Sequence, residues 1–222
     1  MQFIANGRFG GALPNFCLGL VLALVPLPAV ALPLLSEVFY DAAGSDNGLG
    51  FVEIYGEPGL SLAGFTIEGV NGANGVVTVT LALVGTIPED GIFLLADDAG
   101  DGSSLVAGAD LVLNFDFQNG PDGIALRNNS AVVDAIGYGV FGPSEVFAGE
   151  GAPAPDVPAG SSLARRFANV DTDDNAADWV ALTTPTPGFA PLQSVPEPAA
   201  GALLALGLVA IASRARRKCA VR

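Results

Sequence analysis

The stretch GVVTVTLALVG, residues 75–85, alternates between two kinds of side chain. One row is apolar and the other is hydroxylic or small; the rows are Val77, Val79, Leu81 and Leu83 against Thr78, Thr80 and Ala82. Successive side chains of a β-strand point to opposite faces of the sheet. A period of two therefore predicts a strand with one face on a core and the other toward water.

The same period recurs along most of the chain, and no stretch between these runs has the 3.6-residue period of an amphipathic helix. Asn-Gly and Asp-Gly pairs separate the apolar runs, and these pairs tolerate the positive φ of hairpin turns. The predicted fold class is all-β, with a two-sheet β-sandwich as the favoured architecture. We expect strands near residues 34–40, 50–55, 62–68, 75–84, 91–96, 110–117, 123–127, 131–138 and 161–167, then an extended exit over 180–194.

The N-terminal end has the features of a secretory signal peptide. Arg8 precedes an apolar stretch from Phe16 to Val30, and a small-x-small cleavage site is formed by Ala29 and Ala31. Two prolines within the apolar stretch argue against the alternative, a buried N-terminal helix. We predict that residues 1–31 are a signal peptide cut after Ala31, and that the exported domain follows.

The exported part is strongly acidic. Residues 32–194 contain 22 Asp and Glu against three Arg, a net charge of −19. This balance excludes a nucleic-acid partner, because phosphate binding needs clusters of Lys and Arg. The chain has no histidine, and Cys17 and Cys219 lie outside residues 32–194. Histidine-based catalysis or metal binding and an internal disulfide are therefore excluded as well.

Four segments, taken in order, resemble the lamin tail domain family in its exported bacterial form. They are LLSEVFYD (34–41), GFVEIYG (50–56), LSLAGFTIEG (60–69) and SLARRFANVDTDDNAADWVALTTPTPGF (162–189). Phe65 stands where the family commonly has Trp. The resemblance implies an immunoglobulin-like two-sheet β-sandwich over residues 32–190. It implies no catalytic residues, because the family shares no catalytic set.

Two carboxylates stand inside apolar strands. Glu37 and Glu53 each interrupt a hydrophobic run, and a pair of carboxylates is what glycoside hydrolysis requires. The structural interpretation is that each glutamate lies at a strand edge or hydrogen-bonds to loops within the sandwich. The sequence favours that interpretation and leaves the hydrolase as an alternative.

The acidic segment DTDDNAAD, residues 171–178, is the candidate metal site. Its predicted Ca²⁺ ligands are Asp171, Asp173, Asp174, Asn175 and Asp178. The segment is not an EF-hand, because Ala176 and Leu182 stand where that loop needs Gly and Glu. The alternative is a solvated loop in which Asp174 or Asn175 caps a short helical turn. The segment ADDAGD, residues 96–101, is a poorer second candidate.

The C-terminal sequence VPEPAAGALLALGLVAIASRARRKCAVR, residues 195–222, has three parts in a fixed order. A linker over 191–198 ends in Pro-Glu-Pro, an apolar helix is expected over 199–213, and a basic tail follows over 214–222. Residues 199–212 carry no charge, but 14 residues of helix span only about 21 Å of a hydrocarbon core about 30 Å thick.

This order resembles the PEP-CTERM sorting signal. The matching residues are Val195, Pro196, Glu197, Pro198, Arg214, Arg216, Arg217 and Lys218. The resemblance implies an exosortase-like sorting protease as partner, transient insertion of the helix in the inner membrane and removal of the tail. A plain short C-terminal anchor is the alternative, with the basic residues on the cytoplasmic side.

Together these features predict a non-enzymatic protein exported to the envelope, cell surface or extracellular matrix of a Gram-negative bacterium. Its expected role is structural or adhesive, with extracellular polysaccharide as a candidate partner and weak Ca²⁺ as the one candidate cofactor. A Ca²⁺-dependent adhesion module and a small carboxylate-dependent glycan hydrolase are the alternatives.

Overall fold

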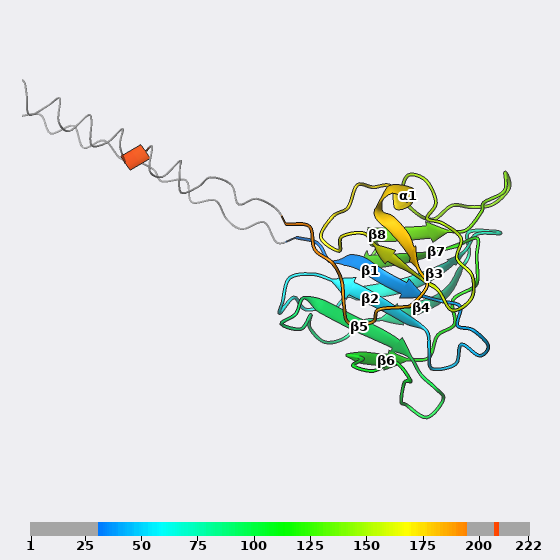
Figure 1. The fold of residues 1–222 in the computed structure, drawn as a ribbon, viewed down its shortest axis with the longest axis horizontal. Coiled ribbons are helices and arrows are strands. Elements are labelled where there is room, and N and C mark those ends of the chain that lie inside the picture. The colour runs from blue at the N-terminus through cyan, green and yellow to red at the C-terminus, as the bar shows by residue number, and fades with distance from the viewer. Residues whose placement is uncertain (1–30, 195–206, 209–222) are drawn as a thin grey trace, which may run out of the picture. The chain divides into compact units, whose positions relative to one another are not determined.

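The computed structural model of the chain describes residues 31–194 and 207–208. Within that range the elements are ten strands and one helical turn, drawn in Figure 1. Their bounds are β1 Leu34–Phe39, β2 Phe51–Tyr55, β3 Phe65–Asn71, β4 Val77–Ala82, β5 Ile92–Asp97, β6 Leu111–Leu113, β7 Asp122–Asn128, β8 Ala131–Tyr138, β9 Ser162–Arg165, α1 Asn175–Asp178 and β10 Trp179–Leu182.

The strands form two sheets. The larger sheet has six strands in the order β10-β9-β1-β2-β5-β6, and the smaller has four in the order β4-β3-β7-β8. Neighbours pair antiparallel, except that β5 and β6 run parallel. The two-sheet, almost wholly β architecture expected from the sequence is therefore confirmed.

One continuous core fills the space between the sheets. Its members are buried apolar side chains from both, among them Leu35, Ile54, Ile67, Leu95, Ile124, Leu126, Ile136 and Trp179. A smaller cluster, which includes Phe39, Phe51 and Leu94, packs on the other side of the larger sheet. Every member of both clusters lies between residues 35 and 179. Residues 32–194 thus contain the apolar surface that stabilises the fold.

Several strand boundaries differ from expectation by up to three residues, and two differences are larger. The alternation over 110–117 predicts one long strand, but β6 ends at Leu113, and Phe115 and Phe117 enter the core from the following loop. Residues 180–194 are expected to be an extended exit without a named strand, and the structure forms β10 over Trp179–Leu182, paired with β9. Period two alone could not indicate which apolar residues find a ladder partner.

The predictions for the two ends of the chain fall largely outside the described residues. These are the signal peptide, the Pro-Glu-Pro triplet, the apolar helix over 199–213 and the basic tail over 214–222. Among the described residues, no helix is both long enough and apolar enough to cross a membrane.

Candidate functional site

A buried arginine lies among several acidic side chains. Arg165, the last residue of β9, has 1% of its surface exposed. Its guanidinium donates two hydrogen bonds to the Asp134 carboxylate, at 2.8 and 2.9 Å, and one to Asp178 at 3.0 Å. Further bonds reach Asp171 at 3.3 Å and the carbonyl oxygens of Leu35 and Val170. One side chain thereby joins β1, β8, β9 and the acidic loop.

The surroundings of Arg165 explain why a charge can be buried here. Two of its carboxylate partners, Asp134 and Asp178, have side chains 0% and 4% exposed. The guanidinium also lies 5.1 Å from the centre of the Trp179 ring, a cation–π distance. A buried ion pair is tolerated only when geometry is good and the remaining donors are satisfied, and both conditions hold at Arg165.

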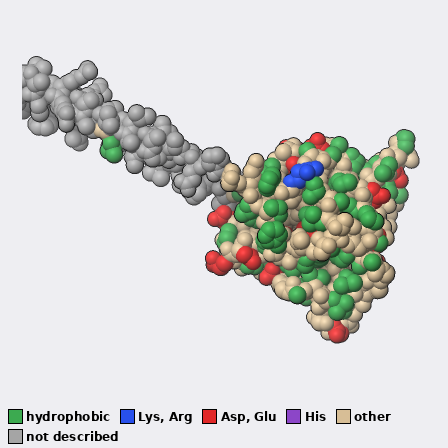
Figure 2. All heavy atoms as spheres, in the orientation of Figure 1, with side chains coloured by type: hydrophobic (Ala, Val, Ile, Leu, Met, Phe, Trp, Pro, Cys, Tyr) green, Lys and Arg blue, Asp and Glu red, His purple; other side chains and the backbone are tan. Residues whose placement is uncertain are grey.

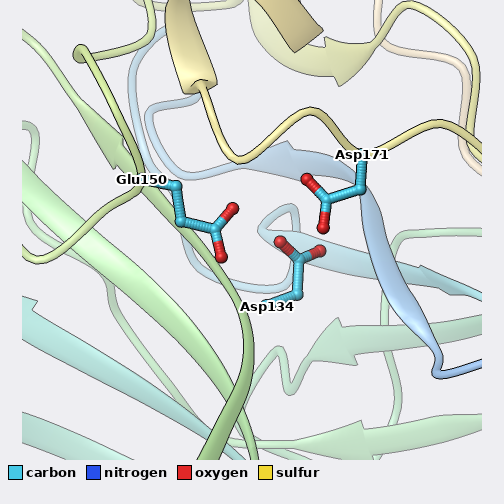
Figure 3. A group of neighbouring side chains, drawn as sticks. All are labelled: Asp134, Glu150 and Asp171. Atoms are coloured by element: carbon cyan, nitrogen blue, oxygen red, sulfur yellow. The ribbon is translucent and has the colours of Figure 1, made fainter.

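Figure 3 shows three carboxylates that converge, and two of them, Asp134 and Asp171, also bond Arg165. Asp134 on β8, Glu150 in the loop after β8 and Asp171 in the acidic loop each place an oxygen within 4.8 Å of the other two. The Glu150 Oε2 atom is buried and has no hydrogen-bond partner among the described residues. Burial, together with the nearby Asp134 and Asp171 carboxylates, raises the pKa of Glu150 to about 7, although the Arg165 guanidinium opposes the shift.

The chemistry open to this cluster is the uptake of a positive charge. Burial also raises the pKa of Asp134, although the Arg165 guanidinium opposes the effect. A proton on Glu150 reduces the repulsion among the three carboxylates. Ca²⁺ takes six to eight oxygen ligands, whereas the guanidinium already occupies Asp134 and one oxygen of Asp171. The geometry favours an arginine-centred structural cluster.

The predicted Ca²⁺ ligands of 171–178 are used as a helix cap and as hydrogen-bond partners of several parts of the fold. Asp174 caps α1 by accepting from the Ala176 N–H, which is the capping alternative foreseen from the sequence. Asn175 is 0% exposed and accepts from the Gly137 and Glu150 amides. Asp178 binds Arg165 and Thr172.

The other two predicted ligands lie nearer the surface. Asp173 is exposed with a positive φ of 55°, and Asp171 bonds Arg165. Of the five, Asp171 alone belongs to a three-carboxylate group within the described part of the chain.

The acids of the second candidate, 96–101, shape loops in the same way. One oxygen of Asp98 accepts three consecutive amides, from Gly100, Asp101 and Gly102. The buried Asp97 accepts from the Gly48 and Phe115 amides, tying two loops to the end of β5. The oxygens are used locally and do not gather around one point.

Glu37 and Glu53 are sealed inside the molecule. They lie directly opposite each other on β1 and β2, and they are 1% and 0% exposed. Glu37 accepts from the Ser162 and Thr186 hydroxyls at 2.6 Å each and from the Thr186 amide. Glu53 accepts from Ser36 at 2.7 Å and from the Gly188 amide at 2.8 Å. The carboxylates hydrogen-bond to neighbouring segments, as the structural interpretation states.

The segment that covers these glutamates leads directly to the C-terminal sequence. After Thr186 and Gly188, Pro191 accepts from the Ala168 amide, and Gln193 exchanges two hydrogen bonds with Asn169. We call residues 183–193 the strap. It is held against the domain as far as Gln193.

Sequence reasoning missed Asp134, a fully buried carboxylate, and recognised its partner only as a cation. Asp134 interrupts the apolar run AVVDAIGY, the signal that singled out Glu37 and Glu53. The partner, Arg165, is one of three basic residues in the exported part. A charge in a buried strand needs a partner, so an acid in such a strand can be sought together with one of the few cations of the domain.

Comparison with known protein families gives one match. Residues 194–218 match the PEP-CTERM protein-sorting motif, a signature of export to the cell envelope or surface and of recognition by an exosortase-type system. The match begins one residue after Gln193, the last bonded residue of the strap. No curated protein matches the chain.

Proposed function

We propose that this chain is the precursor of an exported, non-enzymatic β-sandwich that works as a structural or adhesive component of the cell surface or extracellular matrix. The observation that carries the proposal is the PEP-CTERM motif at residues 194–218, which supports export and sorting. An exosortase-like protease acts on the triplet Pro196–Pro198 after the apolar helix over 199–213 has inserted transiently in the inner membrane.

The character of the domain supports a passive role. The carboxylates most suited to catalysis by position, Glu37 and Glu53, are buried and bonded to other parts of the protein. On the face in Figure 2, acidic side chains are scattered and basic ones form a single small cluster. Such a surface keeps the domain soluble and suits a hydrated, polyhydroxylated matrix such as polysaccharide.

The resemblance to lamin tail domains belongs to the same proposal. The first two family-like stretches contain β1 and β2, and the third overlaps the start of β3. The fourth runs from β9 through β10 into the strap. On this interpretation the domain is an immunoglobulin-like module of the exported bacterial type. Its ligand is then a surface polymer rather than a small substrate.

Localisation of the full chain tests the proposal. Cells of a PEP-CTERM-sorting host are fractionated after expression of the wild type, of Glu197→Ala in the triplet, and of Glu57→Ala at an exposed position of the domain. Wild type and Glu57→Ala should reach the surface or matrix, and Glu197→Ala should accumulate unprocessed in the membrane. Equal surface delivery of all three would contradict sorting through the triplet.

The hydrolase and the Ca²⁺-dependent adhesion module remain the alternatives. Turnover of a glycan by residues 32–194, abolished by Glu53→Gln, would establish the first. Heat of Ca²⁺ binding, lost on Asp171→Asn, would establish the second.

A further inference from the structure

The β4 strand forms an open edge of the smaller sheet. It pairs with β3 on one side, and no strand among the described residues lies on its other side. Thr78, Thr80 and Ala82 are exposed, and Val77 at its start is 43% exposed. Val76 and Val84, which flank it, are 56% and 59% exposed. The edge is therefore accessible along its length.

The hydrogen-bond pattern shows which backbone groups are open. The Leu83 amide donates to the Phe65 carbonyl at 2.9 Å, so Leu83 faces β3. Alternate residues of an antiparallel strand direct both backbone groups to the same neighbour. Thr80 and Ala82 consequently turn their N–H and C=O groups away from β3, where they can pair with another strand.

The features that usually protect a sheet edge against pairing with another strand are largely missing from β4. No charged residue and no proline occur between Gly69 and Ile87. The one irregularity in the ladder falls between Gly69 and Val70, opposite Val79 and Val77. It leaves Val79–Ala82 in regular register. Natural edges normally carry a charge, a proline or a short strand, and this one has none of them.

The other edges are less available. β6 and β10 are three and four residues long. The end of β8 is occupied, because Tyr138 forms a bridge with Ala154 and the Gly137 amide donates to Asn175. β4 is thus the longest uncovered edge in the described part of the chain.

The charge around β4 indicates which partner can pair with this edge. Two copies of a domain with a net charge of −19 repel wherever carboxylates face each other. Around β4 the charge is neutral: the nearest acid on β3, Glu68, is paired with Arg127 at 2.6 Å. The same uncharged strand in a second copy can approach this edge without setting acids against acids.

We propose that the exported domain self-associates by antiparallel pairing of the β4 edges of two copies. A two-fold axis at Leu81 places Thr80 of each copy opposite Ala82 of the other, so that their free backbone groups bond. The pairing joins the two four-stranded sheets into one continuous sheet. It uses none of the residues of the sorting motif or of the arginine-centred cluster.

Sedimentation equilibrium of residues 32–194 tests the proposal without depending on sorting. The mass should rise toward twice the monomer mass with concentration. It should rise more readily in 1 M than in 0.1 M NaCl, because the Debye length falls from about 10 to about 3 Å. EDTA is included throughout so that divalent bridging contributes nothing. A monomer at every concentration in 1 M NaCl would overturn the proposal.

Three variants locate the interface. Thr80→Pro removes an amide that β3 does not use, and Ala82→Glu places a carboxylate in the uncharged stretch; both should give monomers. Thr80→Val keeps the amide and should still dimerise. Circular dichroism checks that each variant folds. If Thr80→Pro does not fold, the mass of Ala82→Glu alone tests whether the copies pair through β4. Dimers of Ala82→Glu as tight as wild type would contradict pairing through β4.

Discussion

Replacement of the buried Arg165 by Met should be the most destabilising single change in β9. The variant leaves Asp134 and Asp178 buried without the guanidinium that bonds both. Removing one partner of a buried ion pair typically costs about 3–5 kcal/mol, because the remaining charge is uncompensated. The Leu35 and Val170 carbonyls lose a donor as well, which places the expected loss toward the upper end.

Urea unfolding of residues 32–194 measures the loss as a shift in midpoint at constant m-value. Arg166→Met is the matched control, because the neighbouring arginine is exposed and bonds only the Ala177 carbonyl through its side chain. Its cost should stay within about 0.5 kcal/mol.

Adding Asp134→Asn to Arg165→Met should recover about 1–3 kcal/mol, since the double variant no longer buries that unpaired charge. Equal, small losses for Arg165→Met and Arg166→Met would refute the central role of the cluster.

Three further results are expected. Between pH 4.5 and 7 the folded state retains a proton on Glu150 that the unfolded chain has lost, so the free energy of unfolding should fall as pH rises. The fall should be about 1–2 kcal/mol for this partly buried group, and it should be absent in Glu150→Gln. Parallel pH profiles of the wild type and Glu150→Gln would contradict this prediction. Glu37→Gln should lower the free energy of unfolding by about 1–3 kcal/mol and expose the strap to limited proteolysis. Glu57→Gln, at an exposed position, should do neither. Identical digestion patterns of the two variants would show that Glu37 does not hold the strap. EDTA should leave the melting temperature of residues 32–194 unchanged, while a rise in about 10⁻² M Ca²⁺ would support the adhesion alternative.

The sequence was a good guide where local chemistry decides the structure. Period two located the strands through β5, β7 and β8. Asp174 was one of the two residues considered as a cap in the alternative interpretation of the acidic loop, and its donor is two residues away. β10 escaped prediction because its partner, β9, is separated from it by the acidic loop. The exposed Val77 shows a related limit: alternation identifies a strand but cannot show how far the opposite sheet extends over it.

The candidate site depended still more on long-range packing. Asp134 and Arg165 are 31 residues apart, and Glu37 and Thr186 are 149 apart. A single sequence shows that each acid is unusual in its run, but only the fold shows which cation or hydroxyl satisfies it. The acidic loop looked like a ligand set because its acids are close in sequence, whereas the fold directs them to different partners.

The strap holds the chain against the domain up to Gln193, directly before the sorting motif begins. Bonded residues extend to Gln193 and the triplet begins at Pro196, so at most about 10 Å can separate the last bonded residue from the proposed processing site. Processing at the triplet then leaves the strap and all its bonds intact. The mature protein should therefore keep the fold of residues 32–194.

The mass of the native protein recovered from the producing cells tests this account most directly. Export and sorting predict a chain that begins at Leu32 and ends near Pro196–Pro198. A chain that retains Arg222, or one that retains the residues before Ala31, would contradict it.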